Sequence, residues 1–176
     1  MNALQLAAAS LLAAFVSMHP GAQAAPAGAP HGIERPASHD ALLRDAARDG
    51  IVIVALFSLP GCPYCEAVRR EQLRHLAAGQ AAQRLRVVEY DLSDRTPFAD
   101  TAARAPDPAR AADAGRPRTP AALAASLEVR VAPTVAFIGP DGREIAGRLV
   151  GYSSPDFYGA YLEQRIAQAR NRIGAR

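Results

Sequence analysis

The sequence predicts a single α/β domain in which helices pack around a central sheet. Three observations predict this class. Apolar runs of strand length alternate with segments of helical periodicity, a Pro-Asp-Gly tripeptide separates two apolar runs as in a hairpin, and 176 residues suffice for one core. Apolar residues form 49% of the chain and charged residues 21%, as in globular proteins. In chain order we expect a helix, a strand, a helix, a strand, an insertion, a helix, two strands and a helix.

The first residues have the composition of a secretory signal. Residues 4–16 form an uncharged apolar run too short to span a bilayer, and Ala22-Gln23-Ala24 is a small-x-small cleavage site. We therefore expect residues 1–24 to be a cleavable signal peptide. Residues 25–37, rich in Ala, Pro and Gly, are predicted to be a flexible tether. Such a leader predicts export into an oxidising compartment.

The predicted domain, residues 38–176, opens with a short helix. Ser38 or Asp40 can cap its start, and Gly50 ends it. Residues 51–57 are apolar throughout and β-branched in their first half, which predicts a strand buried on both faces. A Leu-Pro-Gly turn then leads into a segment of helical periodicity. The apolar face of that segment consists of Cys65, Val68, Leu73 and Leu76.

The middle of the chain is predicted to hold a second strand, an insertion and another helix. Residues 85–92 have the composition of a strand. Residues 93–118 carry four prolines in an Ala/Arg/Asp background, which indicates an insertion that is partly helical and otherwise loop. Thr119 and Pro120 are suited to the N-cap and first position of a helix that ends near Leu127.

The last third predicts a hairpin followed by a helix. The hairpin has its turn at Pro-Asp-Gly, and the helix begins at Ser154-Pro155 and ends near Gly174. The spacing of apolar residues predicts the buried stripe of this helix. That stripe consists of Tyr158, Tyr161, Leu162, Ile166, Ala169 and Ile173.

The charged residues exclude several functions. All 20 basic residues are arginine, and a chain without lysine has no Schiff-base lysine and no Walker-type phosphate lysine. The net charge is only +3, and the arginines alternate with Asp and Glu instead of forming a basic patch. Nucleic-acid binding is therefore not expected.

The two cysteines, Cys62 and Cys65, allow several interpretations. A structural zinc site needs four ligands, more than the two cysteines and few histidines supply. His75 lies ten residues beyond Cys65 on the same predicted helix, about 15 Å away, which argues against both zinc and a Cys–His hydrolase. A purely structural disulfide remains open, although closing so short a loop constrains the unfolded chain by only about 2 kcal/mol.

A redox pair explains more of the sequence around the cysteines. Cys62 follows a strand and a turn and begins a helix, where unpaired N–H groups and the helix dipole favour a thiolate. Cys65, three residues later, is on the same face and can reach back to form the bridge. We therefore predict that Cys62 is the nucleophile and Cys65 the resolving thiol.

Two motifs resemble the thioredoxin superfamily over residues 40 to 170. They are VALFSLPGCPYC, for the first strand and the cysteines, and VRVAPTVAFIGPDGREIAGRLVGY, for the hairpin. They are most similar to exported bacterial thioredoxins of the SoxW type, and more loosely to TlpA and Dsb proteins. The resemblance implies a thioredoxin-like fold, with a central mixed sheet flanked by helices, and dithiol–disulfide exchange. It implies a cis-proline facing the cysteines at Pro133 and substrate contacts from Pro63, Tyr64, Ala132, Pro133 and Thr134.

The sequence departs from the family pattern near the cysteines. Thioredoxins commonly carry a buried acid six residues before the first cysteine, as proton acceptor for the resolving thiol, and this position is Leu56 here. Gly61 replaces the usual tryptophan before the first cysteine. Glu89, on the second strand, is a candidate substitute proton acceptor, and the alternative is a charge at a sheet edge. Ala132-Pro133-Thr134 does not match the glutaredoxin pattern, which argues against glutathione dependence.

These observations lead to the hypothesis of a periplasmic thiol–disulfide oxidoreductase that acts on protein or small-molecule thiols. No metal or organic cofactor is expected, and we expect a monomer. The resemblance implies that a membrane thiol-reductase of the DsbD/CcdA kind could recycle it. The alternative is a non-catalytic binding or holdase module with the same fold, for which residues 93–118 could form the contact surface. An insulin-reduction assay distinguishes the two.

Overall fold

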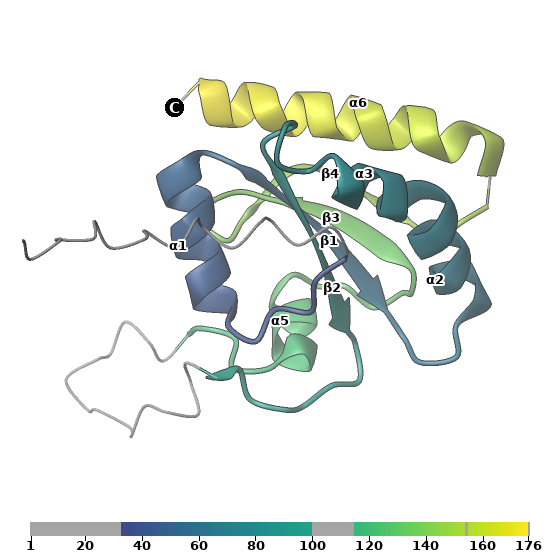
Figure 1. Cartoon of the computed structure of the whole chain (residues 1–176). Coiled ribbons are helices and arrows are strands. Elements are labelled where there is room, and N and C mark those ends of the chain that lie inside the picture. The colour runs from purple at the N-terminus through teal and green to yellow at the C-terminus, as the bar shows by residue number, and fades with distance from the viewer. Residues whose placement is uncertain (1–32, 100–114, 154, 176) are drawn as a thin grey trace, which may run out of the picture.

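The computed structural model describes residues 33–99, 115–153 and 155–175, and its centre is a four-stranded mixed sheet (Figure 1). The strands are β1 (Val52–Ser58), β2 (Leu85–Asp91), β3 (Thr134–Ile138) and β4 (Glu144–Val150). Their order in the sheet is β2-β1-β3-β4. β2 is parallel to β1, whereas β3 is antiparallel to both β1 and β4. This is the predicted α/β class with a mixed sheet.

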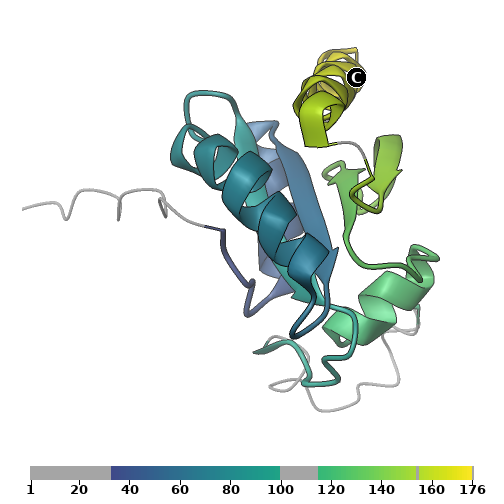
Figure 2. The ribbon, with the colours of Figure 1, turned by 90° about the vertical axis from the view of Figure 1, so that its right-hand side faces the viewer.

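Helices cover both faces of the sheet (Figures 1 and 2). They are α1 (His39–Asp49), the cysteine helix composed of α2 (Pro63–Ala67), η1 (Val68–Leu73) and α3 (Arg74–Ala78), then α5 (Pro120–Ser126) and α6 (Pro155–Gly174). Alternate residues of β1 belong to two different cores. One core, with Leu56, packs against the cysteine helix and α6, and the other, with Phe57, packs against α1 and α5. The predicted strand buried on both faces is confirmed.

The local signals that predicted the ends of the elements correspond to observed caps. Ser38 accepts a hydrogen bond from the backbone of Ala41 at the start of α1, and Gly50 ends that helix in a left-handed conformation. The φ of 59° at Gly50 favours glycine, and a Cβ there would lie 2.7 Å from the Arg84 guanidinium, which would have to move aside. Thr119 caps α5 as predicted. These caps satisfy backbone groups that the helix itself leaves unpaired.

The cysteine helix departs from regular α-helix in its middle. The segment η1 is a π-helix, in which the N–H of Arg74 donates to the carbonyl of Arg69. Val68 and Leu73, its two buried residues, are five positions apart, which is the spacing of a π-turn and not of an α-turn. The π-segment therefore keeps both side chains in the core beneath the helix.

Three sequence-based predictions differ from the structure. The predicted tether includes residues 33–37, yet Glu34 forms a parallel bridge with Val88 of β2, because the backbone groups at this edge of the sheet can pair with another segment. The predicted buried stripe of α6 includes Tyr161, which is 51% exposed, since the face that packs on the sheet is narrower than predicted. Gly174 is the last residue of α6 and not a cap beyond it.

Some predictions fall on residues outside the described ranges. The predicted signal peptide and residues 25–32 of the predicted tether lie there, as do residues 100–114 of the predicted insertion. Among the described residues, no helix is both long and apolar enough to cross a membrane.

Candidate active site

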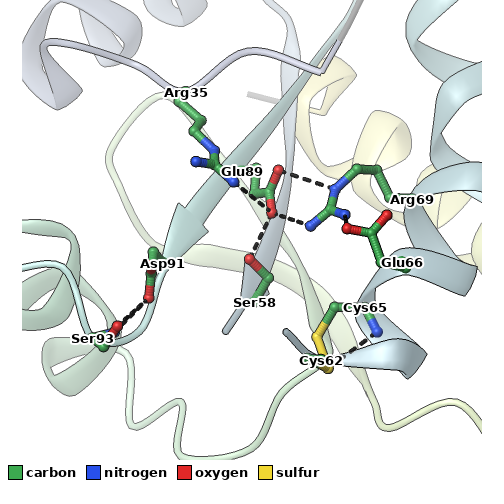
Figure 3. A network of polar contacts seen from close by, with 9 residues as sticks. All are labelled: Arg35, Ser58, Cys62, Cys65, Glu66, Arg69, Glu89, Asp91 and Ser93. Atoms are coloured by element: carbon green, nitrogen blue, oxygen red, sulfur yellow. Dashed lines mark hydrogen bonds and ion pairs between the residues drawn. A yellow bond between two sulfur atoms is a disulfide. The ribbon is translucent and has the colours of Figure 1, made fainter. Parts of the chain in front are cut away.

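The two cysteines lie at the start of the cysteine helix, beyond the end of β1 (Figure 3). Gly61, with a φ of 68°, makes the left-handed turn that leads the chain into the helix. Cys62 is the N-cap residue, and its Sγ accepts a hydrogen bond of 3.1 Å from the backbone N–H of Cys65. The two sulfurs form a disulfide, with the Cα atoms 5.3 Å apart. The positive φ explains why glycine, and not a bulky aromatic residue, precedes Cys62.

The two cysteines differ in accessibility. Cys62 is half-buried, whereas Cys65 is completely buried beneath the helix. Pro63, between them, occupies the first helical position, where its missing N–H costs no hydrogen bond. Tyr64 points outward and is 64% exposed. An incoming sulfur can therefore approach Cys62 and not Cys65.

The segment before β3 reaches the same end of the sheet. The Ala132–Pro133 peptide bond is cis. Thr134 pairs with Phe57 near the end of β1, and its buried hydroxyl donates to the carbonyl of Val131 at 2.7 Å. The carbonyl of Pro133 accepts from Gly151 at 2.8 Å. Among the backbone hydrogen bonds between described residues, none involves Ala132.

Glu89 belongs to a buried polar network beneath the cysteine helix (Figure 3). β2 is an edge strand, yet the Glu89 side chain is only 4% exposed. It accepts hydrogen bonds from the Ser58 hydroxyl at 2.6 Å and from the Arg69 guanidinium at 2.6 and 3.2 Å. Arg35 lies 3.5 Å away. Glu89 is thus a charge on an edge strand, as the alternative has it, but one that is buried and hydrogen-bonded.

The network determines the protonation of Glu89. Burial alone would raise the pKa of Glu89, but the hydrogen bonds from Arg69 and Ser58 outweigh it and hold this pKa below its usual value. The carboxylate in turn raises the pKa of Arg69. Both groups are therefore ionised at neutral pH.

The cysteine pair at the start of the helix is suited to thiol–disulfide chemistry. A thiolate at Cys62 would receive the N–H of Cys65 and the positive end of the helix dipole. The described residues contain no cluster of three or more metal-ligating side chains. A mixed sheet with a CxxC disulfide at the start of a helix is the arrangement of a thiol–disulfide oxidoreductase.

Comparison with known proteins gives the family. A model described as a thioredoxin-like domain matches residues 40–166, and the chain belongs to this family. Its structure is similar to a DsbH oxidoreductase, with 18% identity, a TM-score of 0.52 and coverage of 87% of this chain and 94% of that chain. A mutant of a poplar thioredoxin h gives 18% identity, a TM-score of 0.51 and coverage of 79% and 83%.

The reduced periplasmic thioredoxin SoxS from Paracoccus pantotrophus is 24% identical, with a TM-score of 0.41 and coverage of 67% of this chain and 98% of that one. No curated protein matches the sequence. The family match and the two similar structures confirm the predicted thioredoxin-like fold.

The sequence indicates the cysteine pair but not the polar network around Glu89. Ser58 lies just beyond the predicted strand of residues 51–57, and nothing in the local sequence indicates its contact with Glu89 or the bidentate contact between Arg69 and Glu89. The spacing of five between Val68 and Leu73 was the available signal of the π-segment that contains Arg69.

Proposed function

We propose that this protein is an exported thiol–disulfide oxidoreductase of the SoxW type, working in the periplasm on protein or small-molecule thiols. One observation carries the proposal for the reaction: Cys62 is accessible at a helix N-cap, whereas Cys65 is fully buried and bonded to it. This asymmetry suits an attacking thiol and a resolving thiol.

The exchange proceeds in two steps. The Cys62 thiolate attacks a substrate disulfide, which forms a mixed disulfide and releases one substrate sulfur as a thiolate. Cys65, after losing its proton, attacks the Cys62 sulfur and releases the second substrate thiolate. The substrate gains two electrons and the cysteine pair loses two. A membrane thiol-reductase of the DsbD/CcdA kind would return the pair to the dithiol form.

The surface around Cys62 suits a polypeptide substrate. Exposed apolar side chains gather in the segments that flank the site, with Leu59 40% exposed, Tyr64 64% and Val131 50%. Ala132 offers backbone groups to an extended chain, as in β-strand addition. We assign substrate contact to Pro63, Tyr64, Ala132 and Pro133. Thr134 is buried and supports this surface indirectly, through the hydrogen bond that its hydroxyl donates to the carbonyl of Val131.

Export rests on the amino-terminal sequence. The apolar run and the Ala22-Gln23-Ala24 site predict cleavage before Ala25. Expression of the full chain in a Gram-negative host, followed by mass spectrometry of the periplasmic fraction, should yield a protein that begins at Ala25. Recovery of the uncleaved chain in the cytoplasm alone would contradict export. Size-exclusion chromatography should give a monomer.

Reduction of insulin disulfides in the presence of dithiothreitol tests the reaction. The wild type should accelerate it, and C62S should abolish the acceleration. C65S should accumulate mixed disulfides, which non-reducing electrophoresis and mass spectrometry would identify together with the bound partner. A wild-type protein that binds unfolded chains but does not accelerate reduction would instead be the holdase module.

A further inference from the structure

A buried ion pair joins the cysteine helix to β2. Arg69 donates to Glu89 through two nitrogens, a bidentate geometry that fixes the orientation of both groups. The Arg69 side chain is 21% exposed and the Glu89 side chain 4%. Bidentate contacts with so little exposure are held far more firmly than a surface ion pair. Figure 3 shows the pair on the side of the helix that faces the sheet.

The position of the pair relates it to the disulfide. Arg69 is the second residue of η1, about one helical turn beyond Cys65, so the two side chains leave neighbouring turns of the same helix. Glu89 is paired in the sheet with Leu56, whose side chain lies in the core beneath the cysteine helix. The sheet register thus places a carboxylate beside the strand position at which relatives commonly carry their buried acid.

The charges that face Glu89 come from every element packed against it. The cysteine helix contributes Arg69, which also pairs with Glu66, while β1 contributes the neutral Ser58 and the amino-terminal segment contributes Arg35. Glu66 and Arg35 are largely exposed, so solvent screens them. Among the groups that face Glu89, the two charges best shielded from water are therefore those of Arg69 and of Glu89 itself.

We propose that Arg69 is a positioning residue of the exchange reaction, whose fixed positive charge favours the thiolate forms of the cysteine pair, and that Glu89 limits this effect. The inference rests on the proposed reaction at Cys62. A thiolate attacks and a thiolate leaves in each step, so a charge held one helical turn from Cys65 would change both the rate of attack and the balance between dithiol and disulfide. Glu89, already ionised and bonded to Arg69, acts on this balance by its charge and not by accepting a proton.

The proposal predicts that substitution of Glu89 and substitution of Arg69 shift the Cys62 thiol pKa in opposite directions. E89Q removes the negative charge and leaves Arg69, so the Cys62 thiol pKa should fall and the equilibrium with glutathione should move toward the dithiol form, about threefold to tenfold. R69M should raise the thiol pKa and move the equilibrium the other way by a similar factor. R69K, which keeps the charge, should lie near the wild type.

The experiment measures two quantities on each variant. The thiol pKa comes from the thiolate absorbance of the reduced protein alone, which needs no substrate, and the equilibrium constant comes from alkylation in glutathione buffers. R70M is the matched control, because Arg70 pairs with Glu71 on the exposed side of the same helix. It should change the acid dissociation constant of the thiol and the equilibrium constant with glutathione by on the order of twofold or less. Thermal unfolding confirms that each variant is folded.

Three outcomes would overturn the inference. Thiol pKa values that shift in the same direction in E89Q and R69M would indicate that the ion pair only holds the helix against the sheet. Unchanged thiol pKa values in both would remove the electrostatic role. An E89Q variant with an unchanged thiol pKa that accumulates mixed disulfide would make Glu89 the proton acceptor instead. Because the pKa measurement needs no turnover, it remains decisive even if the insulin assay shows no activity.

Discussion

At the scale of single residues, Cys62 and Cys65 differ in burial and in their position in the helix. Cys62 is half-buried and caps the helix, whereas Cys65 is completely buried and contributes its N–H to the Cys62 sulfur. A thiolate at Cys62 would be stabilised by that N–H and by the helix dipole, and would still meet solvent. Burial of Cys65 restricts its reaction to its neighbour.

Alkylation rates test this asymmetry. In the reduced protein near neutral pH, iodoacetamide should modify Cys62 at least tenfold faster than Cys65, because only Cys62 combines access with a stabilised thiolate. Peptide mass spectrometry over a time course gives both rates. The same measurement in urea, where both thiols are exposed, is the control and should bring the two rates together. Faster labelling of Cys65 in the folded protein would reverse the assigned roles.

At the scale of elements, the cysteine helix sets the redox poise. Its N-terminus favours the thiolate, and Pro63-Tyr64 resembles the dipeptide of glutaredoxins. The usual strand position holds Leu56 instead of an acid, and the charge of the Glu89 carboxylate beside it is offset by its hydrogen bonds from Arg69. Glu66 opposes the thiolate but is exposed and paired with Arg69. We therefore expect a potential of roughly −190 to −230 mV, more oxidising than the approximately −270 mV of thioredoxin. Equilibration with glutathione measures it, and a value at or below about −260 mV would contradict this argument.

Another element, α5, depends on its cap. This helix has only seven residues, and the Thr119 hydroxyl accepts the N–H of Ala122 at 3.0 Å. T119A should therefore lower the free energy of unfolding by about 1 kcal/mol, and T119S, which keeps the hydroxyl, should be close to the wild type. Urea denaturation measures both. Equal stability of T119A and the wild type would show that Pro120 and packing alone begin the helix.

At the scale of the whole molecule, local features were predictable and long-range contacts were not. Caps, the Pro-Asp-Gly hairpin and the cysteine motif depend on residues close in sequence, so their signals survive in the chain itself. The Ser58–Arg69–Glu89 network joins three distant segments, and only the register of β1 with β2 brings them together. The bridge of Glu34 with Val88 was missed because backbone pairing leaves no side-chain signature.

The same network should make global stability depend on pH. The pKa of Glu89 is lower in the folded protein than its usual value of 4.5, so the unfolded chain binds more protons in acid. The ion pair therefore stabilises the fold above about pH 4.5, and this contribution is lost as the pH falls through the folded pKa. E89Q should lower the free energy of unfolding by about 1–3 kcal/mol at neutral pH, because Arg69 and Ser58 lose a charged partner.

The difference in the free energy of unfolding between the wild type and E89Q should become smaller on acidification, since protonated Glu89 resembles glutamine. Urea denaturation at neutral pH and at about pH 3 measures it in both proteins, with the cysteines kept oxidised. The double variant R69M/E89Q indicates how much of the neutral-pH loss comes from leaving Arg69 unpaired, and it should be no less stable than E89Q. A difference that stays constant across this pH range would show that Glu89 does not titrate with folding, and the ionised pair would not be the source of its stability.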